Sequence, residues 1–337
     1  MSNHFYFLIC AAVAPVIAGL GYICAKDRYH KEPLNMLIGA FFCGVLCTIP
    51  VFIVEFFLEF FLKAFVDSPS PLLYAFWTAF IVAACTEECL KFLFLYGFIW
   101  KSPEFDERFD GIVYGVFVSL GFACAENLLY VFGSFSSEGV FAAFQTSFMR
   151  AIFSIPCHFF CGVILGYYLS LAKFETTNRF SPIAQGNTIL KGLFFSILFH
   201  GIYDFILFYQ SALNANANQD AEWSFETCVT NIVLFVIFLV FNIVFWRIGG
   251  RRIGHLANLL QPDLRFESDA FITCSCCGKT YESDLLSCPR CNQLTEQSFR
   301  DQESANFNPQ YQQLHTFNNF YANHDTQFPN RNPYDMQ

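Results

Sequence analysis

The sequence has little charge for its length. Only 14% of its 337 residues are Asp, Glu, Lys or Arg, whereas 55% are hydrophobic and 46 residues are phenylalanine. A soluble domain carries roughly 25% charged residues, so this scarcity excludes a soluble globular enzyme. The basic residues are fewer than the acidic ones, 19 against 28, and they form no basic patch. We therefore expect no nucleic-acid partner, and we expect a lipid bilayer around most of the chain.

Long apolar segments take the place of charge. Seven segments are each long enough to cross a bilayer, which takes about 20 helical residues. The pattern predicts an all-α fold, a polytopic membrane bundle of about seven helices over residues 1–250. No Lys or Arg precedes the first segment, so we expect it to be retained and not cleaved as a signal peptide. The segments are residues 5–25, 34–62, 72–100, 111–133, 140–172, 188–210 and 226–246.

The basic residues between the segments indicate an orientation. Loops on one side hold eleven Lys and Arg residues, and those on the other side hold only Lys63. Because positively charged loops stay in the cytoplasm, the sequence predicts an inner or plasma membrane protein with its N-terminus outside and its C-terminal tail cytoplasmic. The eleven are Lys26, Arg28, Lys31, Lys101, Arg108, Lys173, Arg179, Lys191, Arg247, Arg251 and Arg252.

Four cysteines form a metal-binding pattern in the polar C-terminal part. Cys274 and Cys277 make one CxxC knuckle, and Cys288 and Cys291 make a second one. Disulfides are disfavoured in the cytoplasm, and four thiolates at this spacing are typical of a closed, structural Zn²⁺ site. The sequence predicts a zinc ribbon over residues 273–292, after an interfacial linker over 251–272 and before a disordered Asn/Gln-rich tail over 293–337. What the ribbon binds is unknown.

Ionisable residues lie inside the apolar segments, where each costs at least about 2.5 kcal/mol. The third segment holds Glu87, Glu88 and Lys91, and helical periodicity places the ammonium group between the two carboxylates on one face. One lysine neutralises only one of them. The surplus negative charge favours a site for a metal ion or a proton over an ion pair that only fixes helix packing.

Three further segments contribute polar residues at a similar depth. Asp204 can accept a hydrogen bond from one ring nitrogen of His200 and leave the other free for a metal. Histidines and carboxylates together are typical ligands of catalytic Zn²⁺. Arg150 can hold a substrate carbonyl or pair with a carboxylate. The residues are Glu126 and Asn127 in the fourth segment, Arg150 and His158 in the fifth, and His200 and Asp204 in the sixth.

The motifs of other intramembrane proteases are missing. The sequence has no HExxH zinc helix and no GxSG-like serine segment. The seventh segment has no aspartate to pair with Asp204. A site made of carboxylates and histidines remains.

Two glycine patterns accompany these residues. Gly111 and Gly115 precede Ser119 at four-residue spacing in the fourth segment, and Gly162 and Gly166 repeat that spacing in the fifth. Small residues at this spacing let membrane helices approach closely. We expect these two segments to pack against each other.

Four motifs follow one another on successive segments within roughly residues 1–250. They are Glu87-Glu88-x-x-Lys91, Phe122-x-x-x-Glu126-Asn127, His158 after Pro156, and His200-x-x-x-Asp204. In these motifs the sequence resembles the PrsW family of intramembrane proteases, distant relatives of the type II CAAX prenyl proteases. The resemblance implies proteolysis of a membrane-anchored protein substrate within or near the bilayer, as in regulated proteolysis of an anti-sigma factor.

The resemblance also implies a general base. Glu87 or Glu88 would polarise the attacking water, and we favour Glu87. Lys91 would compensate the charge of both.

The remaining residues would hold the reacting groups. Glu126, His158 and His200 would be the ligands of a catalytic zinc ion or, in a metal-free enzyme, the groups that hold water and the oxyanion. Asn127 and Asp204 would orient their neighbours.

Two other functions fit the same buried residues. A proton- or ion-coupled transporter also uses intramembrane carboxylates and histidines as relays. Carriers commonly have repeated halves, whereas the four motifs show no repeat. A non-catalytic membrane scaffold would keep the fold without the chemistry, but every expected catalytic position is filled here.

Overall fold

The computed structural model describes residues 2–27, 31–65, 70–175, 181–217, 225–259, 271–278, 280–282, 285, 288 and 290–291. The chain forms two compact units, and the division falls between Ala270 and Phe271. The predicted disordered tail, residues 293–337, lies outside the described residues, as does the linker segment 260–270.

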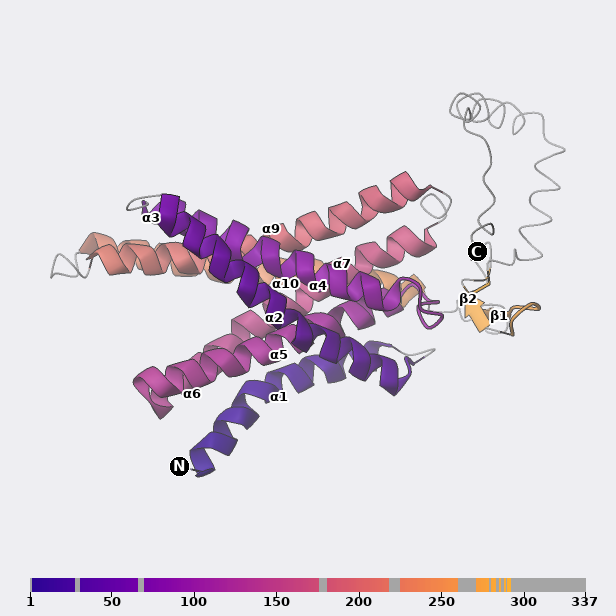
Figure 1. Ribbon diagram of the computed structural model, residues 1–337, viewed down its shortest axis with the longest axis horizontal. Helices are drawn as coiled ribbons and strands as arrows, with labels where there is room; N and C mark the ends of the chain where they lie inside the picture. The colour runs from indigo at the N-terminus through magenta and orange to yellow at the C-terminus, as the bar shows by residue number, and fades with distance from the viewer. Residues whose placement is uncertain are drawn as a thin grey trace, which may run out of the picture. The chain divides into compact units, whose positions relative to one another are not determined.

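The first unit is an all-α bundle whose successive helices run back and forth along one direction (Figure 1). Two short π-helical segments, η1 and η2, interrupt longer α-helices without ending them. The bounds are α1 (Ser2–Lys26), α2 (Leu34–Phe65), α3 (Pro71–Phe76), η1 (Trp77–Cys85), α4 (Thr86–Ile99), α5 (Asp110–Glu138), α6 (Val140–Met149), η2 (Arg150–Ser154), α7 (Ile155–Phe174), α9 (Pro182–Ala217) and α10 (Phe225–Leu259).

Six helices in the described part of the chain are long and apolar enough to cross a membrane. The prediction of an all-α, polytopic membrane fold is therefore confirmed. The third predicted segment is α3, η1 and α4, residues 71–99, which carries Glu87, Glu88 and Lys91 and is not among the six. The count of seven crossings stays a prediction.

Helix α5 is the centre of the bundle and packs against α7, α2 and α1. A Cβ atom at Gly115 would lie 2.5 Å from the carbonyl oxygen of Gly162, and one at Gly166 would overlap the backbone of Gly111. The absence of side chains lets the two backbones touch, as small residues do in membrane helix pairs. The predicted close approach of these helices is confirmed, and it fixes how far Glu126 on α5 stands from His158 on α7.

A cluster of acidic groups lies at the end of the bundle where α5 begins. Asp110 accepts hydrogen bonds from the backbone N–H groups of Asp106 (2.9 Å) and Glu107 (2.6 Å). The hydroxyl of Tyr114 donates to Glu32, whose side chain is also hydrogen-bonded to Asp110. Burial raises the pKa of the Glu32 carboxyl from its usual 4.5 to about 7.

This pKa shift predicts a pH dependence of stability. The unfolded chain releases the Glu32 proton near pH 4.5, but the folded protein keeps it until about pH 7, so stability is lost as pH rises through this window. Glu32→Gln mimics the protonated form and removes this loss, which amounts to at most about 3 kcal/mol. We expect the variant to melt a few degrees higher than the native protein in detergent at pH 8, and the two to melt alike at pH 4.5.

The exposed Glu138 at the end of α5 provides the control. Glu138→Gln should leave the melting temperature unchanged at both pH values. Equal melting of native protein and Glu32→Gln at pH 8 would contradict the proposed role of Glu32.

Helix α10 extends further than its apolar segment. Residues 251–259, which the sequence assigns to an interfacial linker, continue the helix to Leu259. Ile253 and Leu256 are buried, and the hydroxyl of Tyr167 on α7 lies 3.3 Å from both Arg252 and His255. This part of the predicted linker therefore packs on the bundle.

The second unit contains an antiparallel hairpin of β1 (Phe271–Thr273) and β2 (Thr280–Glu282). Phe271 pairs with Glu282 and Thr273 with Thr280. Cys274 follows β1 directly, and the turn back includes Gly278 at φ 72°, a backbone conformation that favours glycine. The hairpin thus carries the first CxxC knuckle in its turn.

Candidate active site

The π-helix η1 leads directly into the first motif. Short π-helical stretches inside α-helices occur frequently at functional sites, and η1 is nine residues long. Thr86 begins α4, and its three charged residues follow within one and a half turns. The Nζ atom of Lys91 lies 2.8 Å from Glu87 Oε2 and 2.9 Å from Glu88 Oε1. The predicted arrangement, an ammonium group between two carboxylates, is confirmed.

Lys91 also connects this helix to α7. Its Nζ lies 3.0 Å from Nδ1 of His158 and 4.0 Å from the centre of the Phe122 ring. Lys91 is completely buried. A single ammonium group thus faces two carboxyl groups, an imidazole and an aromatic ring, and it can neutralise only one negative charge.

Helix α5 contributes Glu126 and Asn127, and both are held by Arg150 of η2. Arg150 donates to Glu126 Oε2 at 2.8 Å and to Asn127 Oδ1 at 2.8 Å. Asn127 in turn donates to the backbone carbonyl of Ala12 on α1 at 2.7 Å. Of the two roles that the sequence allowed for Arg150, the structure has the pairing with a carboxylate.

His158 lies between two charged groups. Its Nε2 is 2.9 Å from Glu126 Oε2, and its Nδ1 faces Lys91. Because Lys91 can only donate, Nδ1 accepts and Nε2 carries the proton that it donates to Glu126. The preceding Pro156 has no N–H group to complete the helical ladder, and the π-helix η2 lies just before it.

Helix α9 contributes a third set of contacts. His200 Nδ1 lies 2.9 Å from Glu88 Oε1, and His200 Nε2 lies 3.3 Å from Asp204 Oδ2. The predicted contact of Asp204 with His200 is present, but the second ring nitrogen faces a carboxylate and is not free. Ser196 donates to Glu88 Oε2 at 2.6 Å. Sequence reasoning missed Ser196, although it lies one helical turn before His200.

Glu87 has fewer partners than Glu88. Glu88 is hydrogen-bonded to Lys91, Ser196 and His200, whereas the hydrogen bond of Glu87 is to Lys91. Glu87 Oε2 lies 4.0 Å from a nitrogen of His158 and 4.0 Å from a nitrogen of His200. The two imidazole rings meet edge to face with centres 5.1 Å apart. Glu87 therefore keeps an oxygen for another molecule.

A cavity of about 430 Å³ opens onto this set. Glu87, Glu126, His158, His200 and Asp204 line it, whereas Glu88, Lys91 and Asn127 do not. Further lining residues include Glu59 and Gln210, close to the ends of α2 and α9. These ends lie at the same end of the bundle as the N-terminus (Figure 1). The cavity thus extends from the polar set toward that end.

Four groups could hold a metal ion in the bundle. Glu87, Glu88, His158 and His200 each offer one ligand atom, and these atoms lie within 4.8 Å of one another. Glu126 is outside this group, so its assignment as a metal ligand stays a prediction. His158 and His200, which the sequence assigned as ligands, belong to this group, and so does Glu88, which the sequence offered only as a candidate base.

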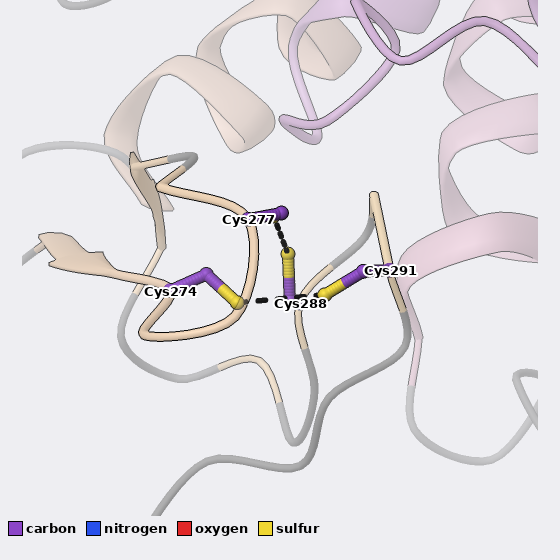
Figure 2. Close-up of side chains that lie close together, drawn as sticks. All are labelled: Cys274, Cys277, Cys288 and Cys291. Atoms are coloured by element: carbon purple, nitrogen blue, oxygen red, sulfur yellow. Dashed lines mark hydrogen bonds between the residues drawn. The ribbon is translucent and has the colours of Figure 1, made fainter.

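The second unit has a separate sulfur cluster, shown in Figure 2. Cys274 Sγ lies 3.5 Å from Cys291 Sγ, and Cys277 Sγ lies 3.6 Å from Cys288 Sγ. All four sulfurs lie within 4.8 Å of one another. The two CxxC knuckles therefore converge, as their spacing predicted.

The fold and the site define a class: a multi-pass integral membrane protein with buried carboxylates and imidazoles of the kind that hydrolases use. A sequence model described as PrsW family intramembrane metalloprotease matches residues 32–243. The chain belongs to this family and is a peptidase.

Curated relatives agree with this assignment. Protease PrsW of Bacillus subtilis (strain 168) is 38% identical over 202 residues, 60% of this chain and 83% of that protein. Protease PrsW of Clostridioides difficile (strain 630) is 35% identical over 200 residues, 59% and 79% of the two chains. Protease PrsW of Geobacillus kaustophilus (strain HTA426) is 35% identical over 202 residues, 60% and 80%. No solved structure matches the chain.

Proposed function

We propose that the peptidase cleaves a membrane-anchored protein within the bilayer and that Glu87 is its general base. One observation carries this proposal: Glu87 is the member of the Glu-Glu pair that lines the cavity, with one hydrogen bond and two imidazoles at 4.0 Å. Glu88 lies behind it, hydrogen-bonded to three side chains. Glu88 and Lys91 are therefore proposed to set the position and charge of Glu87.

The reaction follows from these positions. Glu87 takes a proton from a water molecule while the water oxygen attacks the carbonyl carbon of the peptide bond. Glu87 then returns the proton to the amide nitrogen as the C–N bond breaks. His158 and His200, each with a nitrogen 4.0 Å from Glu87, would hold the water and the oxyanion, and each would turn an N–H group to them in place of its present carboxylate partner. Asn127 holds Arg150 in place, and Asp204 orients His200.

The same group of side chains has the donor set of a metal site, but a metal ion would have to replace the Lys91 ammonium group, which lies within 3.0 Å of Glu87, Glu88 and His158. His158, His200 and Glu88 would hold it, two imidazoles and a carboxylate being a common catalytic zinc set, and Glu87 would remain the base. A bound zinc ion would supply Lewis-acid polarisation of the water and the carbonyl. Glu126, hydrogen-bonded to both Arg150 and His158, suits a positioning role better than the ligand role predicted for it.

The cysteine cluster is proposed as a second, structural zinc site. Four thiolates without an open position hold the ion closed, and its binding supplies folding energy to a short segment that has almost no core. The ribbon would then bind a partner or position the C-terminal unit, and it would take no part in the reaction in the membrane.

We further propose that the N-terminus lies outside an inner or plasma membrane and the C-terminal unit in the cytoplasm, because Lys and Arg gather on one side. The cavity extends toward the N-terminal end of the bundle, so it would admit substrate from the outer half of the bilayer. A single-span regulator such as an anti-sigma-like factor is the substrate class that the family resemblance suggests.

The test compares the membrane proteomes of cells that express the native protein or Glu87→Gln. We expect at least one membrane protein to accumulate uncut in the variant. In native cells its fragments should begin or end within or beside its transmembrane segment. Glu138→Gln, an exposed change at the end of α5, should match the native protein. Identical processing in native and Glu87→Gln cells would count against the proposal.

A further inference from the structure

Glu55 is a carboxylate of the cavity that the proposed reaction does not use. It lies on α2, where Phe56 and Phe57 are exposed as lipid-facing side chains are. Together with Phe52 and Glu59, Glu55 lines the cavity from the other face of the helix. The spacing of these three residues, i, i+3 and i+7, is that of one helix face. Helix α2 thus turns Glu55 and Glu59, with Phe52, toward the cavity, and it turns Phe56 and Phe57 toward lipid.

Every other acidic residue that lines the cavity has a basic partner. In the described part of the chain Glu55 has neither a hydrogen bond nor an ion pair. An ionised group without a partner at this depth costs at least about 2.5 kcal/mol. The partnered acids are Glu87 with Lys91 (2.8 Å), Glu126 with Arg150 (2.8 Å), Asp204 with His200 (3.3 Å) and Glu59 with Lys63 (3.2 Å).

The contact between α2 and α5 places Glu55 relative to the reacting groups. Gly44 packs on the backbone of Val118 and Phe122, and from this contact both helices run toward the same end of the bundle while they diverge, α2 toward α3 and α5 toward α6 (Figure 1). Glu55 lies eleven residues beyond Gly44, whereas Glu126 lies four to eight residues beyond those contacts. At 1.5 Å per residue, Glu55 is about 5–11 Å further along the bundle than Glu126, toward the end of α2.

We propose that Glu55 is a specificity-determining residue that binds a lysine or arginine side chain of the substrate. The inference rests on the proposed proteolytic function of the cavity. The cations around the cavity are already paired, so a positive side chain entering with the substrate meets Glu55 as the open partner. In an extended substrate at about 3.3 Å per residue, that side chain lies within about three residues of the scissile bond, on the side toward the end of α2.

The test uses the full-length protein in liposomes of phosphatidylethanolamine and phosphatidylglycerol. The probes are quenched transmembrane peptides of one apolar sequence, in which a single Lys, Gln or Glu is moved through the positions around the centre. At one position, we expect the native protein to prefer Lys over Gln by about tenfold in kcat/KM, equivalent to about 1.4 kcal/mol. Glu55→Gln should lower this ratio to near one, and Glu55→Lys should favour Glu at the same position.

Glu59→Gln distinguishes a specific contact from a general attraction by negative charge. Because Glu59 is paired with Lys63, this variant should keep the Lys preference. The inference is overturned if the native protein cleaves Lys and Gln peptides alike, if Glu55→Gln keeps the preference, or if Glu59→Gln removes it equally. If the native protein cleaves none of the Lys, Gln or Glu peptides, the result would instead contradict the proposed function. Glu87→Gln should cleave none of them.

Discussion

Lys91→Met is expected to abolish cleavage and to cost about 3–5 kcal/mol of stability, the usual price of removing one partner from a buried ion pair. The Nζ atom lies within 3.0 Å of Glu87, Glu88 and His158, and the side chain is completely buried. Methionine fills the space but leaves two adjacent carboxylates without their cation. One of them must then take up a proton, and the proposed base loses its charge. The melting temperature in detergent and the processing of the accumulated substrate measure the two effects.

The chain contains a matched control for this change. Lys63 is paired with Glu59 at the same i, i+4 spacing, but both side chains are substantially exposed, and such pairs contribute only about 0.3–0.5 kcal/mol. Lys63→Met should therefore melt almost like the native protein. Adding Glu88→Gln to Lys91→Met removes one of the stranded charges and should recover part of the stability. Native melting and processing by Lys91→Met would show that the ammonium group is dispensable.

The positions of most helices in the bundle can be predicted from the ends of the apolar segments in the sequence. The first five predicted segments coincide with the observed helices within about five residues, because each long apolar run must satisfy its backbone hydrogen bonds internally, whereas α9 and α10 extend further than their predicted segments. The π-helices η1 and η2 could not be predicted, because one extra residue in a turn leaves no trace in hydropathy. The continuation of α10 through residues 251–259 was missed for a related reason. The charged Arg251 and Arg252 lower the mean hydropathy of this stretch, although Ile253 and Leu256 beside them are buried.

The site divides in the same way. The Lys91 contacts with Glu87 and Glu88 and the His200 contact with Asp204 lie within single helices, so the helical rotation of about 100° per residue predicts them. The contacts between helices depend on rotation and tilt, which the sequence does not contain. Helical periodicity therefore could not assign Glu126 to Arg150 and His158, or Glu88 to Ser196 and His200.

Metal analysis of the purified full-length protein is expected to find two equivalents of divalent metal per chain. Structural zinc in small domains contributes about 10–16 kcal/mol at neutral pH, so loss of one ligand should release the ion and unfold the ribbon. Cys288→Ser should therefore remove one equivalent, since Cys288 lies 3.6 Å from Cys277 within the four-sulfur cluster. His200→Ala should remove the other, because its imidazole belongs to the membrane group.

The two variants should also separate in activity, because the clusters lie in different units of the chain. Cys288→Ser should still process the substrate, whereas His200→Ala should not. A protein that retains full cleavage after Cys288→Ser has removed all of its metal would contradict the metal-dependent form of the mechanism. Glu87 would then act on water directly, with Lys91 as the cation that keeps it ionised beside Glu88. Lys91 and a metal ion would contact the same oxygens of Glu87 and Glu88, so both forms of the mechanism place a cation there. Cleavage measured together with metal content distinguishes the two forms.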